Sequence, residues 1–297
     1  MATVDNAVYV GGRRTADPHS LEETFEVMRA RSGMAWIGLY RPEEPEVHAV
    51  ADEFGLHELA VEDALQGHQR AKLERYGETL FVVLRPARYL DASETVDFGE
   101  VHVFVGPDFV VTVRHAEAPD LAVVRRRMEQ DPVLLAWGPG AVLYGILDEV
   151  VDQYAPVVAG LENDIDEIED EIFTSHHDAS RRIYELSREV IAFQRAIHPL
   201  VSMLAALQDG PDQDASRQEG PAEELQRRLR DVQDHVLRII ERVDAFRALL
   251  NNALMVQATL IAQRQSEETQ RLAEASLAQN EEVKRISSWA AIIVDDA

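Results

Sequence analysis

The sequence contains no cysteine, which excludes disulfide bonds and every metal site built on thiolates. Basic residues are scarce: 29 lysines and arginines stand against 54 aspartates and glutamates, so the formal net charge is -25 at pH 7. Because nucleic-acid binding depends on neutralising phosphates with lysine and arginine, this balance disfavours a nucleic-acid partner. It favours cations or basic partners, although acidity can also serve only to keep a protein soluble.

The signatures of common enzyme classes are also missing. The chain has no Gly-x-Ser-x-Gly nucleophile elbow, no Walker A loop, no Gly-x-Gly-x-x-Gly fingerprint and no His-Glu-x-x-His zinc motif. We therefore predict that the protein is not an enzyme. Residues 1–14 lack the apolar core of a signal peptide, and no run reaches the roughly 18 apolar residues that a membrane span needs.

The first half of the chain alternates helical and strand patterns, which predicts an α/β domain over residues 1–140. Ser20 followed by Glu23 forms a capping box ahead of a helix that runs to Arg31. Short runs rich in β-branched and aromatic residues predict strands. The strands are expected at residues 34–40, 79–84, 100–105 and 109–113. Further helices are expected at residues 45–54, 57–66 and 119–130. These elements predict a sandwich with a mixed or antiparallel sheet.

After residue 140 the sequence predicts helices alone. Residues 141–208 are expected to form an acidic antiparallel hairpin, with helices at 141–173 and 179–208 around a turn at 175–178. A segment rich in Gly, Pro, Asp and Gln, residues 209–220, is a predicted linker. The fold class is therefore α+β: an α/β sandwich domain with a mixed sheet, an acidic helix hairpin and a very long C-terminal stalk helix over 221–297.

The last helix carries the strongest periodicity in the sequence. Its apolar positions alternate in steps of four and three, which is a heptad seam. The seam consists of Leu225, Leu229, Val232, Val236, Ile239, Val243, Phe246, Leu250 and Ala253. No Gly or Pro interrupts residues 222–294, so the helix would be on the order of 110 Å long. We expect copies of itself, or other helices, to lie along this seam.

Two segments of the hairpin carry groups that could attract a cation. Seven carboxylates lie within residues 162–171 (ENDIDEIEDE). One interpretation is a solvated helix face with its isoleucines packed inward, and the other is attraction of hydrated Mg²⁺. His176, His177 and Asp178 could bind a transition metal, or could simply form the turn between helices.

Carboxylates also flank the seam of the last helix. They are Asp231, Asp234, Glu241 and Asp244. Such residues usually pair with arginines of a neighbouring helix, and five arginines lie nearby in the sequence. The alternative is a metal bridge between subunits.

Four segments, in a fixed order, carry a family resemblance. They are residues 62–74 (EDALQGHQRAKLE) with the strand 80–84 (LFVVL), residues 195–200 (RAIHPL), residues 230–250 (from RDVQDH to FRALL) and residues 280–286 (NEEVKRI). The chain resembles the soluble portion of the CorA family of divalent cation (magnesium) transporters. Ala71 stands where that family usually has proline. The last segment repeats residues 266–272 (SEETQRL) after fourteen residues, or two heptads, so that side chains keep their face.

The resemblance implies a homopentamer whose long helices line a pore, with its α/β domains at the cytoplasmic face of the cell membrane. It implies that Mg²⁺ bound between neighbouring subunits holds the pore closed. Asp231 would be one ligand, and Asp91, Glu94 or Asp97 of the neighbouring α/β domain its partner.

The C-terminal end of the sequence fits this resemblance only in part. The family's Gly-Met-Asn motif and both membrane helices are missing, whereas an apolar run begins at residues 289–294 (WAAIIV) after a basic pair. We therefore expect a chain truncated before its first membrane helix, which would join the membrane through the missing helices.

The predicted function is the cytoplasmic metal-sensing and pore-stalk domain of a magnesium transporter or channel, gated by divalent cations bound between subunits. A zinc, cobalt or nickel transporter of the same superfamily is the alternative, since His176 and His177 suit softer ions. A third interpretation is a soluble coiled-coil scaffold with an α/β head. That scaffold would assemble regardless of divalent ions.

Overall fold

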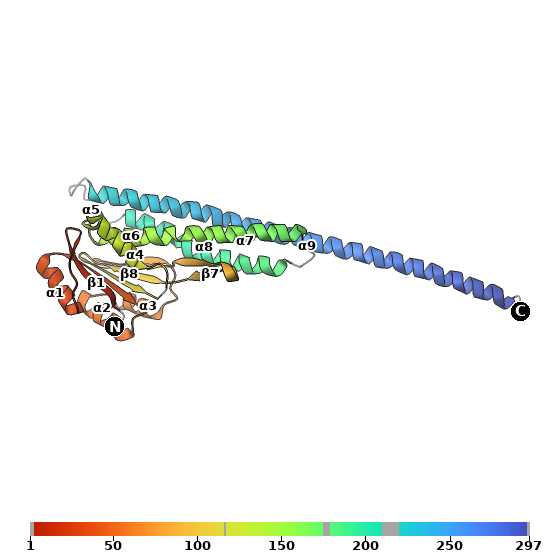
Figure 1. The fold of residues 1–297 in the computed structure, drawn as a ribbon, viewed down its shortest axis with the longest axis horizontal. Coiled ribbons are helices and arrows are strands. Elements are labelled where there is room, and N and C mark those ends of the chain that lie inside the picture. The colour runs from red at the N-terminus through yellow and green to blue at the C-terminus, as the bar shows by residue number, and fades with distance from the viewer. Residues whose placement is uncertain (1–2, 116, 175–178, 210–219, 296–297) are drawn as a thin grey trace.

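The computed structural model describes residues 3–115, 117–174, 179–209 and 220–295. They form an α/β domain, a layer of helices packed on one side of it, and a single helix that continues far beyond both (Figure 1). The predicted turn at 175–178 lies outside the described residues, as does nearly all of the predicted linker.

The α/β domain is built on a seven-stranded mixed sheet of order β2-β1-β3-β9-β8-β5-β4. Neighbouring strands are antiparallel except for β3 and β9, which are parallel. The strands are β1 (Thr3–Val10), β2 (Arg13–Ala16), β3 (Met34–Tyr40), β4 (Lys72–Tyr76), β5 (Thr79–Leu84), β8 (Val101–Val105) and β9 (Phe109–Arg114). The four predicted strands are confirmed as β3, β5, β8 and β9, and they form the centre of the sheet together with the unpredicted β1.

Helices cover both faces of this sheet, because its central strands are apolar on both sides. One face packs against α1 (Leu21–Arg31), α2 (Glu44–Phe54) and α3 (Glu58–Gln66). The other packs against α4 (Leu121–Gln130), the short α5 (Pro132–Leu135) and the helices that follow. The predicted N-cap is confirmed, since the Ser20 hydroxyl accepts a hydrogen bond from the Glu23 amide at 3.2 Å.

The helical layer contains α6 (Pro139–Asp152), α7 (Tyr154–Thr174), α8 (Ser180–Gln208) and α9 (Pro221–Asp295). The prediction of one helix over 141–173 is wrong, because the chain breaks at Gln153, which caps α6. Pro156 lies in the first turn of α7 and has no N–H to continue the hydrogen-bond ladder, which accounts for the break.

The seam of α9 is covered by helices of its own chain. Seven of the nine predicted seam residues are buried, and α9 contacts α6, α7 and α8. Of the two expected covers, copies of the chain or other helices, the structure shows the second over residues 225–253, and these helices belong to the same chain. Cover by the described residues ends near residue 261: every side chain of residues 262–285 is exposed, and Figure 1 shows this part of α9 projecting alone.

Two helices, α8 and α9, are long and apolar enough to cross a membrane by length and composition alone. In α8, 44% of the apolar 18-residue window is buried inside the protein. In α9, searched over residues 221–285, 22% of the most apolar 18-residue window is buried. The side chains of residues 286–295 are not described, so the apolar run at 289–294 lies outside this comparison.

Candidate cation-binding site

A small hairpin of β6 (Ala87–Leu90) and β7 (Thr95–Phe98) carries two of the predicted ligands, Asp91 and Glu94, at its turn. The hairpin lies against α7 and α8. The Tyr89 hydroxyl donates to the Asp164 carboxylate of α7 at 2.6 Å and 2.7 Å from its two oxygens. The ring of Tyr89 packs on Gly160, where a Cβ would come within 2.4 Å of it, so only glycine fits there.

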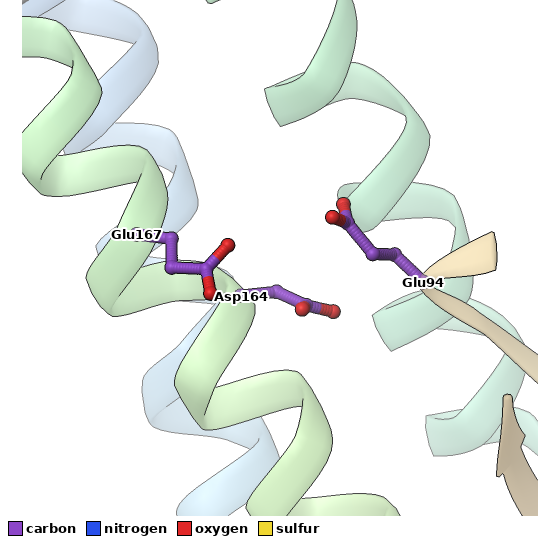
Figure 2. A group of neighbouring side chains, drawn as sticks. All are labelled: Glu94, Asp164 and Glu167. Atoms are coloured by element: carbon purple, nitrogen blue, oxygen red, sulfur yellow. The ribbon is translucent and has the colours of Figure 1, made fainter. Parts of the chain in front are cut away.

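Glu94 meets two carboxylates of α7 at this contact. Glu94, Asp164 and Glu167 offer oxygen atoms that all lie within 4.8 Å of one another. Figure 2 shows the three side chains turned toward a common space between the hairpin and α7. Carboxylate oxygens are the ligands that Mg²⁺ prefers, so the donor set suits this ion.

Arg182 of α8 already supplies a positive charge to this group. Its guanidinium donates to both oxygens of Glu94, at 3.0 Å each, and to Glu167 at 2.5 Å. The Glu171 carboxylate lies 3.4 Å from the same guanidinium. A fork-shaped contact of this kind is among the stronger ion pairs in proteins. The guanidinium therefore neutralises these carboxylates, as a bound cation would in its place.

The protonation of the group reflects this arrangement. Burial raises the pKa of Asp164, and the nearby Glu94 charge acts in the same direction against the Tyr89 hydrogen bond. Burial also raises the pKa of Tyr89, helped by its bond to Asp164. The hydrogen bond from Arg182 lowers the pKa of Glu167. Burial and the Arg182 contact thus shift the pKa values of Asp164 and Glu167 in opposite directions.

Replacing Arg182 by glutamine should uncover a cation site. The change leaves Glu94, Glu167 and Glu171 without their counter-charge, so we expect a loss of about 1–3 kcal/mol in unfolding free energy in the presence of chelator. Millimolar Mg²⁺ should restore part of it, measured by thermal unfolding. The control is Arg181→Gln, because the Arg181 side chain is 87% exposed and its ion pair among the described residues is with Glu185, outside the carboxylate group. A melting temperature of Arg182→Gln that ignores Mg²⁺ would show that the carboxylates cannot hold the ion.

The predicted ligand Asp231 lies elsewhere in the chain. It is exposed on α9, and its side chain makes no hydrogen bond or salt bridge with any residue that the structure describes. Nearby on α9, Gln233 donates to the Val201 carbonyl at 3.3 Å. The β6–β7 hairpin contacts α8 at Arg182, whereas α9 near Asp231 contacts α8 at Val201. Nineteen residues of α8, or about 28 Å, separate these two contacts. The structure does not bring Asp231 and the hairpin together within one chain.

The three candidate ligands of the β6–β7 hairpin, Asp91, Glu94 and Asp97, differ in their surroundings. Glu94 is held by Arg182, and Asp97 lies 3.3 Å from the Arg88 guanidinium. Asp91 is exposed and has no ion pair among the described residues. It is therefore the candidate whose carboxylate is most available to an external partner.

The acidic run at residues 162–171 agrees in part with its interpretation as a solvated helix face, and the carboxylates of α9 have varied partners. Ile165, Ile168 and Ile172 are buried, as predicted for an inward-facing stripe, whereas Asp164 is buried among carboxylates that face water. On α9, Asp244 accepts a hydrogen bond from Gln194 at 2.6 Å and lies 3.6 Å from the His198 ring, so both of these partners belong to α8. His176, His177 and Asp178 lie outside the described residues.

Sequence reasoning missed the pairing of Arg182 with Glu94. The basic pair Arg181-Arg182 near the start of the second hairpin helix was the available signal, since it stands opposite the acidic run in an antiparallel hairpin. Spacing along the chain gave no indication of which carboxylate it would bind.

Comparison with known proteins identifies the family. The family model described as CorA-like Mg²⁺ transporter protein matches residues 31–294. The Bacillus subtilis protein YfjQ, named for metal ion transport, is 30% identical over 230 residues, which cover 77% of this chain and 69% of YfjQ. The cobalt/magnesium transport protein CorA of Thermotoga maritima is 25% identical over 250 residues, covering 82% and 69% of the two chains.

A solved structure shares the fold. The soluble domain of CorA from Methanocaldococcus jannaschii has a TM-score of 0.67 at 17% identity, covering 88% of this chain and 99% of that one. It has the same mixed-sheet domain followed by helices and a long C-terminal helix. The predicted fold class and resemblance are confirmed, and the chain belongs to the CorA-like Mg²⁺ transporter family, a family of membrane transporters for magnesium and other divalent cations.

Proposed function

We propose that this chain is the cytoplasmic metal-sensing and pore-stalk part of a magnesium transporter or channel, working as a homopentamer at the cell membrane. The observation that carries the proposal is the uncovered half of α9. Residues 262–285 expose every side chain, including Leu272 and Leu277 at 66% each. A lone helix in water is only marginally stable, so this half requires neighbours along its length. Equivalent helices of a symmetric ring would provide them.

The metal-sensing part of the proposal rests on Asp231 and Asp91. Both are exposed carboxylates without an ion pair among the described residues, and they are too far apart to share an ion within one chain. An ion that joins them must therefore bridge two subunits. Glu94 is a weaker choice because Arg182 already binds it. Mg²⁺ suits such a site, since it often binds through one or two carboxylates and keeps several waters.

The proposed gating follows from charge. Each copy carries a formal net charge of -25, so bringing copies together around an axis is opposed by strong repulsion. Cations bound between subunits offset this repulsion and favour a tight, closed ring. When the ion concentration falls, the ring loosens and the pore opens.

A transporter of zinc, cobalt or nickel is the alternative within the family. Softer divalent ions are usually bound by imidazole or thiolate, whereas the ligand candidates among the described residues are carboxylates. The carboxylates suit Mg²⁺, whereas the alternative rests on His176 and His177, which lie outside the described residues.

Thermal unfolding followed during titration with Mg²⁺, Co²⁺, Ni²⁺ or Zn²⁺ tests the proposed function. We expect millimolar Mg²⁺ to raise the melting temperature, because an ion that binds the folded state and not the unfolded chain stabilises the fold. Stabilisation by Zn²⁺ alone at low concentration would contradict magnesium sensing. Sedimentation unaffected by chelator would instead support a scaffold that assembles regardless of ions.

A further inference from the structure

A cavity of about 270 Å³ lies between the loop that follows α3 and the middle of α8. The loop contributes His68, Gln69 and Arg70, and α8 contributes Arg195. Two of the segments that carry the family resemblance, residues 62–74 and 195–200, therefore meet at one place in the fold. The sites discussed above use neither of them.

The cavity is basic, in contrast to the rest of the chain. No carboxylate is among its lining residues. Arg70 and Arg195 make no hydrogen bond or salt bridge with any residue in the described ranges. Both are exposed, and both line the cavity. The third arginine, Arg85, is neutralised by Glu100 at 3.0 Å. Two uncompensated guanidinium groups thus face one cavity in a protein of net charge -25.

The loop is held in a costly conformation around these groups. Gly67 and the following His68 both have positive φ, at 63° and 58°. A left-handed conformation at a residue other than glycine is strained and persists only where the surroundings impose it. Arg85 imposes it here in part, since its guanidinium donates to the Gln69 carbonyl at 3.1 Å. The loop is therefore fixed in position before any ligand arrives.

The remaining walls leave room for a ligand. Ala192 and Ala196 of α8 are small, and the Phe98 ring provides a flat apolar side. Arg85 lies over this ring, 5.8 Å from its centroid. The cavity thus combines a pair of free guanidinium groups with an aromatic surface.

We propose that this cavity binds a phosphoryl group, carried either by inorganic phosphate or by a nucleotide, through Arg70 and Arg195. The planar guanidinium fork matches two phosphate oxygens at once, which an isolated ammonium group cannot do. In a nucleotide, the base or ribose would extend toward Phe98. The bound anion joins the α/β domain to α8, and so ties the sheet to the helical layer that supports α9.

Calorimetric titration of the protein with sodium phosphate, ATP and adenosine tests this proposal. Chelator is present throughout, so that the outcome does not depend on the proposed metal site. We expect phosphate or ATP to bind, and Arg70→Gln and Arg195→Gln each to weaken binding by at least about tenfold. The matched control is Arg188→Gln, because Arg188 is exposed on the same helix but does not line the cavity. Its affinity should equal that of the wild type.

The two sources of the phosphoryl group give different patterns. Binding of ATP about tenfold or more tighter than phosphate assigns a nucleotide, and equal affinities assign free phosphate. Failure of both to bind, binding of adenosine alone, or an equal loss in Arg188→Gln would overturn the proposal. Unchanged thermal unfolding of the variants in buffer without phosphate excludes misfolding as the cause of a loss.

Discussion

Replacing Asp231 by asparagine is expected to remove most of the stabilisation that Mg²⁺ gives to the assembled protein. The amide keeps the size of the side chain but removes the charge that draws a hard cation out of water. We expect the midpoint of a Mg²⁺ titration, followed by thermal unfolding, to rise by about tenfold or more, equivalent to about 1.4 kcal/mol. In the presence of chelator the variant should unfold like the wild type, because Asp231 has no partner among the described residues of its own chain.

Asp234→Asn is the matched control for this variant. Asp234 is also exposed on α9, one turn further on, and its carboxylate has no ion pair in the described part of the chain. The substitution changes the net charge by the same amount. If both variants shift the midpoint equally, the effect belongs to the overall charge, and Asp231 is not a ligand.

Truncating Phe246 to alanine is expected to cost about 3–5 kcal/mol of unfolding free energy, the usual range for an aromatic residue lost from a core. Phe246 is 3% exposed in the seam where α9 packs against helices α6, α7 and α8. Leu272→Ala is the comparison, because Leu272 is 66% exposed in the uncovered half of the same helix. In the dissociated chain, measured at low protein concentration, that change should stay within about 0.5 kcal/mol. Urea unfolding followed by circular dichroism measures both.

The dependence on protein concentration distinguishes the two possible covers of the seam. If the chain's own helices cover it, the loss in Phe246→Ala is the same at every protein concentration. If copies cover it, the loss varies with concentration, since association then contributes to stability. A concentration-dependent loss, or one below about 1 kcal/mol, would contradict the packing described here.

The sequence predicted the strands whose apolar character is continuous, because burial on both faces demands it. It missed β1 (TVDNAVYV), in which polar residues interrupt the apolar run, and β4 (KLERY), which is mostly charged. β4 lies at one edge of the sheet, where charged side chains discourage pairing with other molecules. Its strand character comes from pairing with β5, not from local preference.

The residues of the heptad seam of α9 were predicted, whereas its partner was left open between copies of the chain and other helices. A periodic apolar stripe requires cover, but the stripe itself does not specify which helices supply it. In this fold the hairpin helices turn their own apolar faces toward α9, through residues such as Leu161, Ile165 and Leu204. Only the distal half, which contains the fourteen-residue repeat, is left for other copies.

The candidate site was less predictable than the fold. The family resemblance implied carboxylates at the turn of the β6–β7 hairpin and on α9, and Asp91 and Asp231 are both exposed there. The capture of Glu94 by Arg182 joins residues 88 positions apart, so no local pattern encodes it. The same applies to the meeting of Arg70 with Arg195, which depends on how α8 lies across the sheet.

Crosslinking between subunits tests the central claim, that the metal site is shared by neighbouring copies. Because the chain has no cysteine, an Ala92→Cys/Arg230→Cys variant carries two thiols beside Asp91 and Asp231 and leaves both carboxylates in place. The positions are too far apart to react within one chain. With a short thiol crosslinker in Mg²⁺, we predict a ladder of covalent products that ends at five chains and forms more slowly in chelator. Chains that remain single in Mg²⁺, or a ladder that ends at two, would contradict a metal-bridged pentamer.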